Sequence, residues 1–351
     1  MKKINIIYLL PEFKGASGGG KVIYKHSIIL NNLKKNISSE VLHLKKKFSY
    51  KFKTSLSKKF KFLDDKKAGW DGTKMRVGKN FVPDKKWFKE EIYRKTNFDF
   101  DSQKDFVVIP EIWAHFAEDL EFYKKKINYG IFVQGFYHMN SSNEFSKLKK
   151  SYENASLILT DSVYSIKYLK EMFPKQKNKI IRINFSINIK NFRIKKKSNI
   201  ITYMPRKLPA HSNLLNFYLK NLIPKSWKLV PLKNISQKKL IDTLARSKIF
   251  LSFSNFEGIG IPPIEAALSG NKVIGYVGGG GIEYWKKPIF TKVENGEIRD
   301  FGQKILLNLY KDEKIWLKKT SFQRLKLASQ YSKKNEVLSL IKLTNRISKL
   351  F

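Results

Sequence analysis

Two glutamates, Glu257 and Glu265, have the spacing in this chain that best suits chemistry on a bound ligand. Glu257 follows the apolar run 249–253, which is typical of a buried parallel strand, and precedes a glycine-containing turn at 258–261. Prolines at 262–263 then suit the first turn of a helix. A helix start directs unpaired N–H groups and positive dipole charge at the preceding loop, so a phosphate or sugar diphosphate can bind there. We expect Glu265 in the first turn of that helix and Glu257 on the loop side of the same ligand.

These residues also carry a family resemblance. The two glutamates, with Gly-Ile-Gly-Ile-Pro between them and Ala-Ala-Leu-Ser-Gly after the second, resemble the E-x7-E signature of glycosyltransferase family 4, whose members are retaining enzymes of the GT-B fold. The segment 275–284 resembles a second glycine-rich loop of bacterial polysaccharide and lipopolysaccharide sugar transferases. The resemblance implies that Glu257 contacts the donor sugar as a catalytic residue and that Glu265 holds the ribose hydroxyls. The alternative is that both are ordinary carboxylates near a helix start.

The same resemblance implies which groups hold the donor diphosphate. Arg206 matches a family arginine that neutralises the diphosphate, a task that suits its fixed fork of donors. The family has a lysine five residues later, where this chain has His211, so the second cation is either Lys207 or missing. The alternative for Arg206 is an ordinary surface arginine. The remaining expected donor contacts lie in the two glycine-rich loops, at Gly258, Ile259, Gly260, Ile261, Gly279 and Gly280.

Three loops in the first half of the chain are candidates for contact with the acceptor or the transferred sugar. Each follows a strand-like segment, and ligands of open α/β sheets bind at the carboxyl ends of strands. One loop has the glycine-rich character that family 4 enzymes show after their first strand. Another has Gln134 where many family members carry a histidine, and nearby His138 is the candidate to replace it. The residues expected to make these contacts are Gly18, Gly19, Gly20, Glu111 and Gln134.

Two motifs indicate other chemistry, but both are weak. Gly15, Gly20 and Lys21 have the spacing of a P-loop, yet Val22 stands where the hydroxyl that binds Mg²⁺ would be. The triplet 99–101, Asp-Phe-Asp, resembles the metal motif of GT-A transferases, but it precedes a strand instead of following one. The five histidines are scattered and form no cluster with ligand spacing. We therefore expect transfer without a metal or other cofactor.

Length and periodicity predict an α/β protein of two Rossmann-like domains. The 351 residues exceed the roughly 250–300 at which a single core stops growing. By resemblance to GT-B enzymes we expect an N-terminal acceptor-binding domain at 1–192, facing a C-terminal nucleotide-sugar domain at 193–351 across a cleft, with the final helices, about 328–351, packing back on the first domain. The expected strands are 4–10, 105–110, 129–133, 157–160, 180–183, 200–203, 227–231, 249–253 and 272–276.

Composition limits the location and the partners. Cysteine is absent, which excludes disulfides and thiolate chemistry. No apolar run is long enough to span a membrane, and the N-terminal apolar stretch lacks a cleavage site. The net charge of +41 comes mostly from lysines spread along the chain, so much of it is compositional. Cations and aromatics are densest in Lys45–Phe62, for which we prefer contact with an anionic membrane surface; nucleic-acid binding is the alternative, although no specific nucleic-acid motif accompanies it.

Taken together, these features predict a cytoplasmic hexosyltransferase, peripheral at the inner face of the cell membrane. It would move a sugar from a nucleoside diphosphate donor to a glycan or lipid-linked acceptor, with retention and without a metal. Two other classes stay open. One is a nucleotide-sugar epimerase of the same architecture, and the other is a non-enzymatic basic protein that binds nucleic acid or another polyanion.

Overall fold

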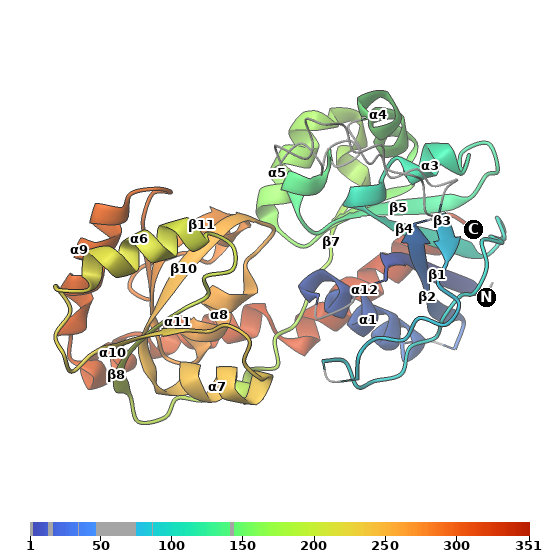
Figure 1. Cartoon of the computed structure of the whole chain (residues 1–351). Helices are drawn as coiled ribbons and strands as arrows, with labels where there is room; N and C mark the ends of the chain where they lie inside the picture. The colour runs from blue at the N-terminus through green and yellow to red at the C-terminus, as the bar shows by residue number, and fades with distance from the viewer. Residues whose placement is uncertain (1–2, 13–16, 34, 47–74, 86, 141–143) are drawn as a thin grey trace. The chain divides into compact units, whose positions relative to one another are not determined.

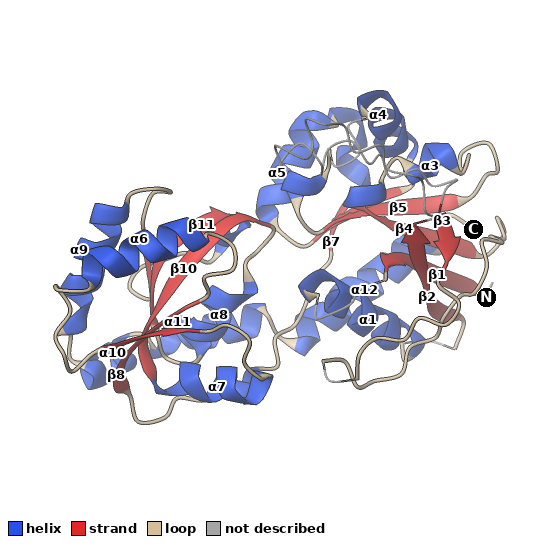
Figure 2. Ribbon diagram, viewed as in Figure 1, coloured by secondary structure: helices blue, strands red, loops and turns tan. Residues whose placement is uncertain are grey.

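The computed structural model describes residues 3–12, 17–33, 35–46, 75–85, 87–140 and 144–351. The chain forms two compact units. Unit 1 comprises Met1–Asp161, Ser165–Ile183 and Val337–Phe351, and unit 2 comprises Ser162–Tyr164 and Asn184–Glu336. Each unit has a parallel sheet flanked by helices (Figures 1 and 2). This confirms the predicted α/β class with two Rossmann-like units.

The described part of unit 1 has a seven-stranded sheet in the order β3-β2-β1-β4-β5-β6-β7. Only the edge strand β3 runs antiparallel to its neighbour. The strand bounds are β1 Ile4–Pro11, β2 Ile37–Lys46, β3 Met75–Val77, β4 Asp105–Pro110, β5 Asn128–Val133, β6 Leu157–Thr160 and β7 Ile180–Arg182. The helices are α1 Gly18–Asn31, α3 Phe116–Asp119, α4 Phe145–Asn154, α5 Val163–Met172 and, at the C-terminus, α12 Lys333–Ile347.

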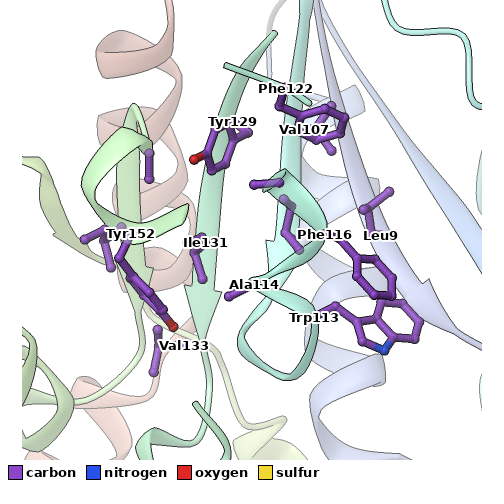
Figure 3. Packing of buried hydrophobic residues seen from close by; sticks show 14 of the residues in the cluster. Leu9, Val107, Trp113, Ala114, Phe116, Phe122, Tyr129, Ile131, Val133 and Tyr152 are labelled. Atoms are coloured by element: carbon purple, nitrogen blue, oxygen red, sulfur yellow. The ribbon is translucent and has the colours of Figure 1, made fainter. Parts of the chain in front are cut away.

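Strand β4 is buried along its whole length, as expected for a central parallel strand that is covered on both faces. Directly after it comes the 3-10 helix η3, Glu111–Trp113. The rings of Trp113 and Phe116 stack within 10° of parallel, with centroids 5.2 Å apart, in the core shown in Figure 3. These buried aromatics fix the position of the chain directly after β4, where Glu111 lies.

The C-terminal helix returns to unit 1, as predicted. Val337–Phe351 belongs to that unit although Asn184–Glu336 does not. The Arg346 guanidinium donates a hydrogen bond to the carbonyl of Asn178 at 2.8 Å, and the Asn128 amide donates to the carbonyl of Leu350 at 3.4 Å. These bonds connect α12 to the segment before β7, and the residues after α12 to the strand β5.

Unit 2 has a five-stranded parallel sheet in the order β12-β11-β10-β8-β9. Its strands are β8 Ser198–Tyr203, β9 Lys228–Pro231, β10 Ser247–Glu257, β11 Lys272–Gly279 and β12 Phe290–Lys292. Its helices are α6 Pro209–Leu219, α7 Gln237–Arg246, α8 Ile261–Leu268, α9 Ile298–Leu309, α10 Glu313–Lys319 and α11 Ser321–Gln330. The strand β10 is longer than the predicted 249–253, so that Glu257 is its last residue instead of a loop residue.

The structure bears on one of the two predictions about membranes. Among the described residues, no helix combines the length and the apolar character needed to cross a membrane. The basic aromatic segment Lys45–Phe62 lies, beyond Lys46, outside the described residues.

Candidate active site

The turn between β10 and α8 places the two glutamates of unit 2. Gly260, the residue before α8, has φ +77°, a left-handed conformation that glycine adopts without strain. The helix then begins at Ile261, with prolines in its first turn and no side chain capping its N-terminus. Glu265 is therefore the fifth helical residue, and the prediction that it lies in the first turn was wrong. Proline is tolerated throughout the first turn, so the proline pair did not mark the start of the helix to the residue.

The prolines also change which backbone groups can meet an anion. Pro262 and Pro263 have no N–H, so the first four residues of α8 offer only the donors of Ile261 and Ile264. An anion at this helix start needs further donors from neighbouring loops. The second glycine-rich loop lies beside the turn and is one source.

The two glycine-rich loops pack directly against each other. Glu257 pairs with Gly279 in the β10–β11 register, after an irregularity that begins at Ser254. A Cβ on Gly280 would overlap the carbonyl of Gly258, and a Cβ on Gly278 would lie 2.7 Å from the Cβ of Ser254. The close approach of the two backbones therefore requires glycine at these positions, because there is no room for a side chain.

Tyr284 forms hydrogen bonds to the turn and was not predicted as a site residue. Its hydroxyl lies 3.0 Å from the carbonyl oxygen of Ile259 and 2.8 Å from that of Gly260, so its single hydrogen is shared between two acceptors. The side chain is 4% exposed, and burial raises the pKa of Tyr284 well above its usual value, with a smaller contribution from Glu257. The only sequence signal was its position at the end of the second glycine-rich segment.

The loop between β8 and α6 brings one predicted cation to a predicted carboxylate. Lys207 forms an ion pair with Glu257. Arg206 is exposed, and among the described residues no ion pair involves its guanidinium. Nδ1 of His211 lies 3.1 Å from the hydroxyl of Tyr276, a residue of β11. Lys207 is thus engaged with the glutamate, and His211 with the sheet.

In unit 1, Glu111, Gln134 and Gly19 come together at the carboxyl ends of β1, β4 and β5. The N–H of Gly135 donates a hydrogen bond to Oε1 of Glu111 at 3.0 Å. The Gln134 amide donates to the carbonyl of Gly19 at 3.2 Å, and a Cβ on Gly19 would lie 2.8 Å from Oε1 of Gln134. A Cβ on Gly135 would lie 2.9 Å from Cδ2 of His138 and 3.5 Å from Oε1 of Glu111. The predicted residues therefore form one polar cluster.

The carboxyl group of Glu111 has a raised pKa because it is buried. The side chain is 6% exposed, and burial raises the pKa of Glu111 to about 7, although backbone N–H groups partly oppose this shift. Near neutral pH this carboxyl can therefore hold or release a proton.

The glycines that open α1 are less constrained than those of unit 2. Ser17 caps the helix by accepting a hydrogen bond from the N–H of Gly20 at 3.2 Å. A Cβ on Gly18 would meet no atom within 4 Å. Ser17 was not predicted as a site residue, although serine before a helix start is a common cap.

Within the described ranges, no group of three His, Cys, Asp or Glu side chains is placed to hold a metal ion. Asp101 of the triplet at 99–101 instead accepts a hydrogen bond from the N–H of Gln103 at 2.9 Å and pairs with Lys104 at 3.3 Å. These contacts shape the turn before β4.

Solved structures share this architecture along their whole length. A glycosyltransferase from Rickettsia africae is 14% identical, with 100% of this chain and 99% of that chain covered and a TM-score of 0.59. Sucrose-phosphate synthase from Thermosynechococcus elongatus is 10% identical, with 99% and 100% covered and a TM-score of 0.63. HepE from Anabaena, solved with UDP-glucose, is 11% identical, with 99% and 100% covered and a TM-score of 0.61. No family model matches the chain, and no curated protein is significantly similar to it.

Two Rossmann-like units, each with a mostly parallel sheet, and the returning C-terminal helix define the GT-B fold, which these solved structures share. At identities of 10–14% the likeness establishes the fold, and the chemistry must be argued from the residues.

Proposed function

We propose that this protein is a retaining glycosyltransferase of the family 4 type, which moves a sugar from a nucleoside diphosphate donor to a glycan or lipid-linked acceptor. One observation carries the proposal: the turn between Glu257 and Glu265 is held by a second glycine-rich loop and by Tyr284 at the carboxyl end of β10. Parallel α/β sheets bind ligands at that edge. The UDP-glucose bound to HepE, a protein of the same fold, supports the donor class.

Each donor contact has a candidate. The exposed guanidinium of Arg206 pairs with the diphosphate, and the N–H groups of Ile261 and Ile264 add uncharged donors. Glu257 accepts hydrogen bonds from the sugar, and Glu265 accepts them from the ribose. Because Lys207 is paired with Glu257, we assign it to orienting that carboxylate and not to the diphosphate.

The proposed reaction keeps the configuration at the anomeric carbon. The acceptor oxygen bonds to that carbon on the face from which the diphosphate leaves, the bond from the carbon to the diphosphate oxygen breaks, and the acceptor proton passes to the departing phosphate. Charge that develops on the phosphate meets the Arg206 guanidinium and the N–H groups at the start of α8. These groups supply positive charge without a metal. The Glu111 cluster of unit 1 binds hydroxyl groups of the acceptor or of the transferred sugar.

A panel of UDP-, GDP- and dTDP-sugars in a thermal-shift assay tests the donor class. A ligand at about 100 times its dissociation constant stabilises the folded state by about 2.7 kcal/mol. No shift with any nucleotide sugar would contradict the proposal. An isomerised nucleotide sugar formed without acceptor would instead identify an epimerase, and salt-sensitive polyanion binding without donor turnover would identify a non-enzymatic protein.

Variants of the two adjacent cations test their roles. Arg206→Ala should abolish most turnover and weaken binding of the free nucleoside diphosphate, while Arg206→Lys should restore only part because the fork is lost. Lys207→Ala should lower turnover but leave affinity for the free nucleoside diphosphate unchanged, since its assigned partner is Glu257. Equal, mild effects of both alanine variants would place the diphosphate site elsewhere.

The setting of the reaction is part of the same proposal. The protein acts in polysaccharide or lipopolysaccharide synthesis in the cytoplasm, and its segment Lys45–Phe62 contacts the inner face of the cell membrane.

A further inference from the structure

The helices α10 and α11 of unit 2 expose three large apolar side chains. Ile315, Phe322 and Leu325 are 69%, 77% and 68% exposed. Phe322 and Leu325 are three residues apart, so they lie on one face of α11, and Ile315 lies on the neighbouring helix α10. The exposed side of a surface helix is normally polar.

The two helices are separated at Thr320. The N–H of Thr320 bonds to the carbonyl of Trp316 at 3.0 Å, and the N–H of Arg324 bonds to the carbonyl of Thr320 at 3.0 Å. Thr320 itself has φ −98° and ψ 2°, outside the α-helical range, so α11 begins there as a second helix. Trp316, Thr320 and Leu327 are buried and hold the opposite side against unit 2.

Positive charge predominates on these two helices. Between residues 314 and 330 the chain has no aspartate or glutamate. Of the two acids just before them, Glu313 is paired with Lys272 at 2.9 Å, and Asp312 caps α10 by accepting a hydrogen bond from the N–H of Ile315 at 2.8 Å. Exposed lysines flank the apolar side chains at positions 314, 318, 319 and 326. The face therefore combines protruding apolar groups with a net positive charge.

We propose that this face of α10 and α11, defined by Ile315, Phe322 and Leu325 with the four flanking lysines, docks on an anionic lipid membrane. Apolar side chains flanked by lysines match the acyl boundary and the headgroups of such a surface. The helix α7 of the same unit, by comparison, exposes Lys238 and Lys239 without any large apolar side chain. The docking face is separate from Lys45–Phe62 and does not depend on the proposed transfer reaction.

Co-sedimentation of the full chain with vesicles tests this proposal. The vesicles contain equal parts of phosphatidylcholine and phosphatidylglycerol, and pure phosphatidylcholine vesicles are the control. We expect Phe322→Gln/Leu325→Gln to bind at least about tenfold more weakly than the parent, and to lose the binding that the parent retains at high salt. Replacing Lys318 and Lys319 by glutamine should weaken binding at low salt by about fivefold for each lysine.

The matched control is Lys238→Gln/Lys239→Gln on α7, which removes the same charge and should bind as the parent does at low salt. Unchanged melting temperatures and unchanged nucleotide-sugar binding would show that each variant is folded. The proposal is overturned if the apolar double variant binds vesicles as tightly as the parent, or if only substitutions in Lys45–Phe62 remove binding. It is also overturned if the parent binds single-stranded RNA but no vesicle.

Discussion

Each unit has a polar region at the carboxyl ends of its parallel strands, and the two regions are built differently. In unit 2 the shape comes from the backbone, because the loops at Gly258 and Gly280 touch with no room for side chains. In unit 1 it comes from side chains, because Glu111 and Gln134 bond to backbone groups of neighbouring loops. The first region should be sensitive to added bulk, and the second to changes of charge.

The largest effect is expected from a methyl group added to the unit 2 loops. Gly280→Ala would overlap the carbonyl of Gly258 and should destabilise the fold by about 3 kcal/mol or more, with loss of donor binding. Gly18→Ala in unit 1 meets open space and should be neutral or stabilise by up to about 1 kcal/mol. Denaturant unfolding measures both. Equal effects would remove the distinction between the two regions.

A change of charge should act most strongly in unit 1. The pKa of Glu111 is about 7 in the folded protein against 4.5 for an ordinary glutamate, so the folded state holds an extra proton between these values. The free energy of unfolding should therefore fall as pH rises from 4.5 to 7. Glu111→Gln should remove this fall and stabilise the protein by about 3 kcal/mol at pH 8, but by little at pH 4.

Unfolding measured across this pH range would show the effect, and acceptor turnover of the same variant should decrease. A parallel pH dependence in parent and variant would mean that Glu111 does not carry the extra proton.

The hydroxyl of Tyr284 should matter for donor binding as well as for the stability of unit 2. Tyr284→Phe leaves two buried carbonyls without their donor and should cost about 1–2 kcal/mol of stability. It should also raise the KM for the donor more than it lowers kcat, because the turn loses its support. Tyr203→Phe, which loses a 2.6 Å bond to Asn216, is the matched control and should leave the donor KM unchanged. The same KM change in both variants would argue against a role of Tyr284 in positioning the turn.

The smallest effect should come from the cap of α1. Ser17→Ala removes the acceptor for the N–H of Gly20 and should cost about 1 kcal/mol of stability without changing donor affinity. Ser236→Ala, at the cap of α7, should cost a similar amount. A change in donor affinity with Ser17→Ala alone would mean that the α1 start also contacts the donor.

Most of the fold could be predicted because its signals are local. Buried parallel strands such as β4 and β6 appear as short apolar runs, and their predicted bounds agree with the structure. The strand β2 was missed, because its buried Ser39 and His43 interrupt the apolar pattern. His43 is stabilised there by a contact with the hydroxyl of Tyr24 at 2.9 Å, which the local sequence does not reveal.

The order of residues by itself determined the α/β alternation and the glycine, proline and glutamate sequence of the turn after β10, because backbone preferences act over a few neighbours. Only the tertiary structure decided the pairing of Lys207 with Glu257, the support from Tyr284 and the meeting of Gln134 with Gly19, which are 115 positions apart. Such contacts depend on strand order and register, which bring distant segments to one edge of a sheet. The burial that raises the pKa of Glu111 has the same origin, since it is produced by the packing around η3 and not by the neighbours of Glu111 in the chain.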